Sequence, residues 1–229
     1  MQHNDDDIIV SVLNGAVETR VAAHPPHDRA FAFDVKLDLV AGRQFFVEKP
    51  PRHFHVLQAE YLEVLEGRVV LELDGRDRVL GRADGPQTIH PYVHHRTYPL
   101  PLEEQEEATR CVRFLLSAEK TSDPFEMNTL MFENWYRYQD EVVTKGGRIS
   151  LIQVFSTFDA GGTYMTLPWW VPFRRTVAQA LGVVVGRWIG SLLGYQPYYR
   201  QWSTDWPLAC DKMETSVFQR RFADRTKTA

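Results

Sequence analysis

The sequence predicts a mainly β protein in its first half, folded as an antiparallel sandwich or barrel, followed by an α-helical C-terminal part. From Ile8 to about Ser117, short apolar or alternating runs of strand length are separated at regular intervals by glycine, proline and aspartate. Beyond Ser117 the apolar residues recur at helical spacing. The 229 residues are enough to bury one core and to carry an extension.

Six runs account for the predicted strands. In the fifth run, Val69, Leu71 and Leu73 share one face, and Gly75 begins a hairpin-like turn into a further strand. The runs are IIVSVLNG (8–15), AFAFDVKLDLVAG (30–42), QFFVEKPP (44–51), EYLEVLEG (60–67), RVVLELDG (68–75) and CVRFLLS (111–117).

Two segments beyond the strands are predicted as helices. NTLMFENWYRYQDEVVTK (128–145) has apolar residues at helical spacing and is followed by two glycines, and ISLIQVFSTFDAGG (149–162) ends in two glycines. We therefore expect a barrel over 8–118 and a helical extension over 119–229, packed on the barrel or on a partner.

The stretch RRTVAQALGVVVGRWIGSLLG (174–194) contains a glycine at every fourth residue from Gly182, a spacing also found in membrane helices. On a helical wheel its large apolar residues share one arc, while Arg187 and the first three glycines lie largely opposite, which predicts an amphipathic helix. We expect it to pack on the body of the protein or on a partner subunit. Contact with a membrane surface, aided by the aromatic residues at its ends, is the less favoured alternative. A bilayer-spanning role is disfavoured because Arg187 would lie in hydrocarbon.

The composition is that of a soluble globular protein, with 44% apolar residues, 24% charged residues and a net charge of -4. The basic excess typical of nucleic-acid binding is missing, so we expect no nucleic-acid partner. The opening MQHNDDD matches neither a secretory signal nor a transit peptide, which predicts a cytoplasmic location. Cys111 and Cys210 are far apart in sequence and are expected to be reduced thiols.

The chemistry is concentrated in HFHVLQAE (53–60). Residues two apart in a strand point to the same face, so His53 and His55 can ligate one ion. Glu60 lies five positions beyond His55, an odd offset, so a turn or bulge must intervene before Glu60 can join them. The competing interpretation is a pair of ordinary hydrogen-bonding histidines in a strand, with Glu60 facing solvent or accepting from a ligand.

A further ligand has to come from TIHPYVHHRTY (88–98), which offers His90, His94 and His95. Neutral histidines and a carboxylate suit Fe(II), Mn(II), Ni(II), Co(II) or Zn(II). If His95 is the ligand, His94 has the opposite strand parity and is expected to point outward unless the strand is bulged there.

These two stretches resemble the motifs of the cupin family. His53-x-His55, four residues, Glu60, six residues and a glycine is similar to the first motif, HxH-x(3,4)-E-x(6)-G, and PYVHHRTY (91–98) is similar to a shortened second motif, PxGxxHxxxN. The resemblance covers roughly residues 30 to 118 and implies a small antiparallel cupin-type β-barrel, or jelly roll. It implies that His53, His55, Glu60 and His95 bind a divalent metal ion inside the barrel. If no residue is deleted from the second motif, Arg96 takes the place of His95.

A metal held by three or four protein ligands keeps one or two positions open for oxygen, water or a chelating substrate. Our preferred interpretation is a metal-dependent small-molecule enzyme, most simply an Fe(II)-dependent oxygenase such as a dioxygenase, or a related oxidoreductase. The family analogy suggests an aromatic or polyketide-like substrate, and it suggests a homodimer. The alternatives are a redox-neutral isomerase, decarboxylase or cyclase that uses Zn, Mn, Ni or Co, and a non-catalytic ligand-binding cupin.

Overall fold

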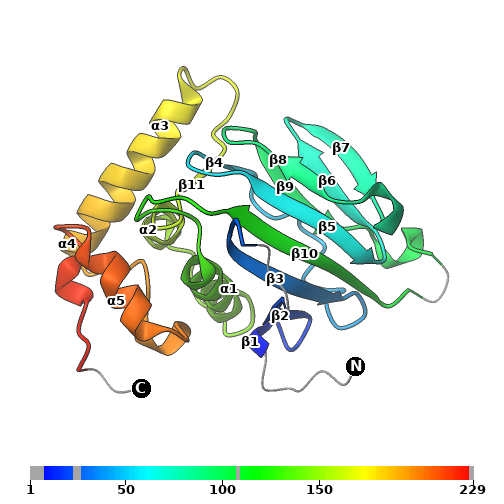
Figure 1. The fold of residues 1–229 in the computed structure, drawn as a ribbon, viewed down its shortest axis with the longest axis horizontal. Coiled ribbons are helices and arrows are strands. Elements are labelled where there is room, and N and C mark those ends of the chain that lie inside the picture. The colour runs from blue at the N-terminus through cyan, green and yellow to red at the C-terminus, as the bar shows by residue number, and fades with distance from the viewer. Residues whose placement is uncertain (1–7, 23–26, 107–108, 227–229) are drawn as a thin grey trace. The chain divides into compact units, whose positions relative to one another are not determined.

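The computed structural model describes residues 8–22, 27–106 and 109–226 (Figure 1). The acidic opening, on which the cytoplasmic prediction rests, lies outside the described residues. The chain divides into two units, each with its own internal contacts. The first unit holds the residues up to His53 together with Gln58–Lys120, and the second holds Phe54–Leu57 together with the residues from Thr121 onward.

The strands of the first unit form two antiparallel sheets, which confirms the prediction of a mainly β, antiparallel first half. Within the described ranges the strands hydrogen-bond as two separate sheets and not as one closed barrel. The first sheet has the order β1 (Ile8–Val12), β2 (Val17–Val21), β3 (Arg29–Asp38), β10 (Cys111–Glu119), β5 (Glu60–Glu66) and β8 (Gln87–Ile89). The second sheet has the order β11 (Thr163–Met165), β4 (His53–His55), β9 (His95–Pro99), β6 (Val69–Leu73) and β7 (Arg76–Leu80).

The core of the first sheet follows from the alternation of apolar and polar residues. On β5, Leu62 and Val64 are buried, as the sequence predicts, and they pair in register with Leu116 and Phe114 of β10. Fully burying a leucine or phenylalanine side chain contributes roughly 1.5–3 kcal/mol to stability. Between β5 and β6 the chain turns at Gly67, whose φ is +68° and where a Cβ would lie 3.1 Å from a backbone carbonyl oxygen. Only glycine suits that position.

The prediction of a strand over 44–51 is wrong, because this stretch folds as successive turns. The carboxylate of Asp38 accepts hydrogen bonds from the backbone N–H groups of Val40 and Ala41 at 2.9 Å each. The carbonyl of Gly42 accepts from Phe45 and Phe46 in the same way. Local hydrogen bonds of this kind satisfy the backbone without a neighbouring strand.

The second unit is mainly helical. The two helices predicted over 128–145 and 149–162 are confirmed as α1 and α2, and each begins at a polar residue, Asn128 or Ser150, whose side chain accepts a backbone N–H of the first turn. A helix at Trp206–Glu214 is an addition to the prediction, and Asp205 caps it. The elements are α1 (Thr129–Val143), α2 (Leu151–Asp159), β11 (Thr163–Met165), α3 (Arg174–Ala180), the π-helical segment η4 (Leu181–Gly190), α4 (Ser191–Leu193) and α5 (Trp206–Glu214).

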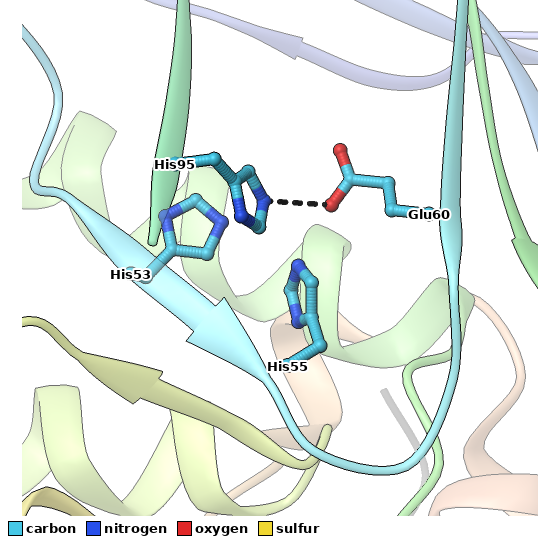
Figure 2. A group of neighbouring side chains, drawn as sticks. All are labelled: His53, His55, Glu60 and His95. Carbon is cyan, nitrogen blue, oxygen red and sulfur yellow. Dashed lines mark hydrogen bonds and ion pairs between the residues drawn. The ribbon is translucent and has the colours of Figure 1, made fainter. Parts of the chain in front are cut away.

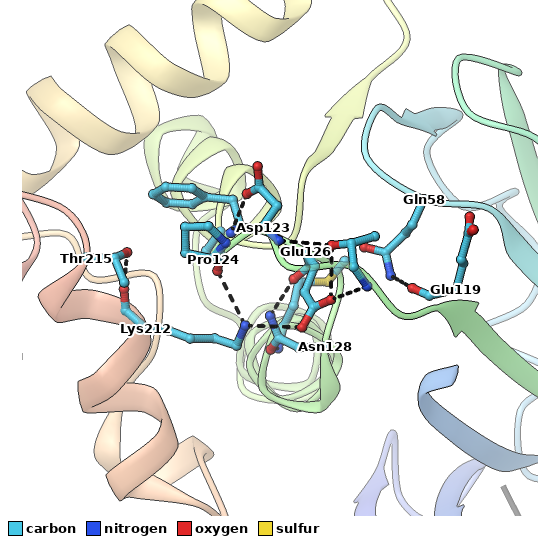
Figure 3. A network of polar contacts seen from close by, with 12 residues as sticks. Gln58, Glu119, Asp123, Pro124, Glu126, Asn128, Lys212 and Thr215 are labelled. Atoms are coloured by element: carbon cyan, nitrogen blue, oxygen red, sulfur yellow. Dashed lines mark hydrogen bonds and ion pairs between the residues drawn. The ribbon is translucent and has the colours of Figure 1, made fainter. Parts of the chain in front are cut away.

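Polar contacts surround the segment that precedes α1. Glu126 accepts from the backbone and hydroxyl of Thr121, and its own carbonyl accepts from the side chain of Asn128 (Figure 3). Lys212 of α5 donates to the carbonyl of Pro124 at 3.3 Å and lies 3.9 Å from the Glu126 carboxylate. This polar network anchors the segment that leads into α1.

The predicted helix over 174–194 is observed as α3, η4 and α4 in direct succession (Figure 1). Its glycine face packs inside the second unit. A Cβ at Gly186 would lie 2.5 Å from the backbone of Phe155 in α2, and one at Gly182 would lie 2.7 Å from the ring of Tyr164. In the part of the chain that is described, Arg174–Leu193 is the one helix long and apolar enough to cross a membrane, which by itself is weak evidence of a span.

Candidate metal centre

The chain conformation around β4 and β5 places the first three candidate ligands. β4 ends at His55, residues 56–59 bend, and β5 begins at Glu60. The turn that the odd spacing of Glu60 requires is therefore present. Glu60 has the same orientation on β5 as the buried Leu62 and Val64, because residues two apart share a face.

The fourth candidate comes from β9. His53 and His95 are directly opposite each other in the antiparallel pair of β4 and β9, and their rings lie 4.4 Å apart between centroids. The sequence places the two residues 42 positions apart, and strand pairing alone brings them together.

The structure brings all four predicted residues into one group (Figure 2). His53, His55, Glu60 and His95 each offer one ligand atom, and these atoms all lie within 4.8 Å of one another. His55, Glu60 and His95 are buried and His53 is half-buried. Metal binding by these residues is a prediction that the geometry accommodates.

The hydrogen bonds of the three histidines select the ring nitrogen that faces the group. His53 and His95 donate from Nδ1 to the carbonyl oxygens of Pro51 and Val93, at 3.1 and 2.9 Å. The Nδ1 of His55 lies 2.9 Å from the hydroxyl of Thr163, and this hydroxyl donates to a backbone carbonyl, so it accepts from the ring. A proton on each Nδ1 makes Nε2 the lone-pair nitrogen, as a metal ligand requires.

Glu60 changes the protonation of His95. The Nε2 of His95 lies 3.2 Å from the Glu60 carboxylate. Burial lowers the pKa of His95, but the charge of Glu60, the hydrogen bond to it and the Val93 carbonyl together raise this pKa above its ordinary value. A cation is thus favoured at this position, and a metal ion would compete with the proton for Nε2.

The donor set fits a first-row divalent metal. Three imidazole nitrogens and one carboxylate oxygen are ligands that Fe(II), Mn(II), Co(II), Ni(II) and Zn(II) accept. The four metal-ligating side chains are buried or half-buried and come from three strands. Burying polar groups is unfavourable unless they interact with a partner, and a metal ion would be a partner common to all four. The residues present therefore suit the metal that the cupin resemblance implies.

The remaining histidines of the second stretch lie outside this group. His90 is exposed. His94 is buried and precedes the first residue of β9, so strand parity does not determine its direction. Two hydrogen bonds join the His94 backbone to Asp74. The N–H of Asp74 donates to the His94 carbonyl, and the Asp74 carboxylate accepts from the His94 N–H. Arg96, the alternative ligand, points instead to Glu72.

Two residues near the centre escaped the sequence analysis. Glu72 on β6 is buried and forms ion pairs with Arg52 and Arg96. The signal for Glu72 was present, because it is an acidic residue inside an apolar strand. Thr163, the partner of His55, has no sequence signal, since 108 residues separate the two.

Comparison with known proteins gives the family. No protein-family model matches the chain. It is 45% identical over 223 residues to the probable oxidoreductase yanE of Aspergillus niger, a match that covers 93% of this chain and 83% of the relative. The chain belongs to this oxidoreductase family. The oxidoreductase macE of Penicillium terrestre is 44% identical, with the same coverage of 93% and 83%. The epoxidase atD of Aspergillus terreus is 37% identical over 76% of this chain, which spans only 53% of that relative.

Solved structures give weaker likenesses. KdgF from a Halomonas species is 18% identical with a TM-score of 0.31 over 47% of this chain and 84% of its own. The polyketide cyclase RemF of Streptomyces resistomycificus is 22% identical with a TM-score of 0.34 over 52% of this chain and 78% of its own. Scores this low support no conclusion about fold or function.

Proposed function

We propose that the chain is a metal-dependent oxidoreductase of the cupin type that holds Fe(II) with His53, His55, Glu60 and His95. The observation that carries this proposal is the group of four ligand atoms within 4.8 Å of one another. The names of the relatives support the reaction class, because yanE and macE are named oxidoreductases and atD is named an epoxidase.

The roles of the side chains follow from their hydrogen bonds. The Pro51 and Val93 carbonyls and the Thr163 hydroxyl hold the three rings with Nε2 toward the metal position. Glu60 adds one negative charge, which lowers the net charge of a divalent centre from +2 to about +1. Fe(II) held by these four residues would supply redox chemistry with dioxygen.

We propose a mostly apolar organic substrate, aromatic or polyketide-like. Leu62 and Val64 share the buried face of β5 with Glu60, so the wall that continues from the carboxylate is apolar. An apolar wall with few polar groups is typical of small-molecule sites. The cytoplasmic location and the homodimer stay predictions from the sequence.

The test begins with the metal content of the purified protein and of a His53→Ala, His55→Ala double variant. We expect close to one Fe(II) per chain in the parent after anaerobic loading, and a loss of most of it in the double variant. His90→Ala is the matched control, because His90 is exposed and outside the group. Equal metal content in the double variant and the control would refute the site.

The reaction class needs a second measurement, the uptake of oxygen by the Fe(II)-loaded protein with a panel of phenols and quinones. Oxygen uptake that needs both Fe(II) and one of these compounds supports an oxidoreductase. Turnover of a compound without oxygen, retained with Zn(II), would instead indicate an isomerase, decarboxylase or cyclase. Tight binding without turnover would indicate a ligand-binding protein.

A further inference from the structure

The second unit exposes a row of large apolar side chains along one helix and the loop before it. We call these residues the apolar face. Trp169 is 85% exposed, Phe173 84% and Leu192 66%. The full set is Trp169, Trp170, Phe173, Val184, Trp188, Ile189, Leu192 and Leu193. Contiguous exposed apolar surface of this kind marks an interaction site more often than chance.

Apart from Trp188, which stacks on Phe218 with ring centroids 5.7 Å apart, the apolar face lies on the side of the helix opposite its packed glycines. Val184, Trp188 and Leu192 follow one another at four-residue intervals. The buried glycines 182, 186 and 190 repeat at the same interval, two positions out of step, and so lie on the opposite side. Gly186 packs on Phe155 of α2, and Gly190 packs on Ile152 of the same helix. The helix is thus packed through its glycines, and the large side chains on the other side are exposed.

The buried side of the helix also argues against a span. Arg187 donates from Nε and Nη2 to the buried carboxylate of Asp159, at 2.6 and 3.0 Å. The guanidinium also lies 3.5 Å from the centre of the Phe125 ring. Inserting the helix across a bilayer would break these contacts and bring Arg187 into hydrocarbon, which is costly. Only the exposed side is available to a lipid.

The charges around the apolar face are positive. Residues 160–204 contain no aspartate or glutamate and four arginines, of which Arg187 is paired with Asp159, whereas the whole chain has a net charge of -4. Arg174 and Arg175 begin the helix that carries the apolar face. Near its other end, the exposed Arg221 donates to the carbonyl of Ser191, and the exposed Arg220 is its neighbour. Basic groups thus flank the apolar residues at both ends.

We propose that the apolar face docks on the surface of an anionic lipid bilayer, with the helix lying in the plane of the interface. Apolar side chains would enter the boundary of the acyl chains, tryptophans would lie at headgroup depth, and the arginines would contact lipid phosphates. A second copy of this chain fits less well as the occupant. A two-fold pairing of this face would bring arginines of one copy against arginines of the other, whether the helices run parallel or antiparallel.

The test is co-sedimentation of the full chain with vesicles. We expect the protein to pellet with vesicles that contain phosphatidylserine and phosphatidylcholine, and to bind pure phosphatidylcholine vesicles about tenfold more weakly. A triple variant, Trp169→Ser, Phe173→Ser and Leu192→Ser, should lose binding to both. These residues are strongly exposed, so the helical signal in circular dichroism should stay unchanged.

The matched control is Val47→Ser, which removes an apolar side chain that is 75% exposed in the first unit. It should pellet like the parent. Arg174→Gln with Arg175→Gln should weaken binding to the anionic vesicles and leave the weak binding to phosphatidylcholine unchanged. The proposal fails if the parent stays in the supernatant with anionic vesicles, or if the triple variant pellets as the control does. Self-association that the triple variant abolishes, in a parent without lipid affinity, would assign the face to a second copy instead.

Discussion

Arg96 donates from Nε to the buried carboxylate of Glu72 at 2.7 Å, one residue beyond the candidate ligand His95. Arg52, which directly precedes His53, forms an ion pair with the same carboxylate. Glu72 therefore ties together the two strands, β4 and β9, at the point where they present their histidines. The carboxylate is positioned to fix the spacing of these two ligands.

Replacing Glu72 by glutamine should weaken metal binding without removing a ligand. The amide keeps the size of the side chain but not its charge, so two guanidinium groups lose their counterion and β4 and β9 lose a link. Changing a residue that orients a metal ligand typically lowers metal affinity 10- to 100-fold. We expect Glu72→Gln to lower it about tenfold. The affinity of parent and variant for Zn(II) is measured by competition with a chelator. Asp77→Asn, on the exposed pair with Lys49, is the control and should leave the affinity unchanged.

Thr163 offers a second test of how the ligands are oriented. Thr163→Val keeps the shape of the side chain and removes the oxygen that accepts from Nδ1 of His55. The ring then loses the partner that fixes its tautomer, and metal affinity should fall by about tenfold. The same change at the exposed Thr88 of β8 should have no effect. Equal affinities in the two variants would show that Thr163 does not orient His55.

The sequence could reveal the four candidate ligands because they lie in two short motifs. The residues that orient these ligands belong to no such motif. His53, His55 and Glu60 are close in the chain, and strand parity together with the need for a turn placed them correctly. Glu72 and Thr163 become neighbours only through the pairing of strands distant in sequence. In β5 and β10 the buried residues alternate with more exposed ones, since one-sided burial imposes a period of two.

The predictions that differ from the structure also failed because they depended on contacts with residues elsewhere in the chain. The apolar residues of 44–51 resemble a strand, but the carboxylate of Asp38 and the carbonyl of Gly42 organise this stretch as turns. The sequence predicted an amphipathic helix over 174–194, and the structure contains this helix, but its packed side is the glycine side and not the arc of large apolar residues. The sequence could not show that the segment is π-helical or that α2 is the element it approaches, because neither property is local.

The pH dependence of metal binding should reflect the Glu60–His95 contact. In the metal-free protein the pKa of His95 is raised above its ordinary value of 6.5. The stabilisation from the charged pair is therefore fully present below pH 6.5 and is lost as the pH rises through the raised pKa. Metal binding has the opposite dependence, since it requires the neutral ring, and its affinity should still increase with pH above 6.5.

Glu60→Gln provides the control for this dependence. The neutral amide removes the charge that raises the pKa of His95, so the rise of metal affinity with pH should move to lower pH. At high pH, where His95 is neutral in both proteins, the variant should bind Zn(II) more weakly because it lacks the carboxylate ligand. A titration of Zn(II) affinity between pH 6 and 9 measures both effects. Superimposable curves for parent and variant would contradict the assignment of Glu60.

Asp159 should be important for stability. It is fully buried and accepts hydrogen bonds from Arg187 and from the hydroxyl of Tyr164. Asp159→Asn leaves the guanidinium of Arg187 largely buried without a negative partner, and breaking a buried ion pair in this way typically costs about 3–5 kcal/mol. Urea unfolding measures the loss. Asp211→Asn, in an exposed pair with Arg225, should change stability by less than about 1 kcal/mol.

The close approach of η4 to α2 gives the last prediction. A Cβ at Gly186 would lie 2.5 Å from the carbonyl carbon of Phe155, and backbone atoms cannot move aside as a flexible side chain does. Gly186→Ala should therefore force the two helices apart and lower the free energy of unfolding by about 1–3 kcal/mol, despite the higher helix propensity of alanine. Gly81→Ala is the matched control, because the nearest atom there is 3.6 Å away and the backbone is extended. Its unfolding midpoint should stay close to that of the parent. If Gly186→Ala were as stable as this control, the glycine face would not be the packed side of the helix, and the assignment of the opposite side to lipid would lose its structural basis.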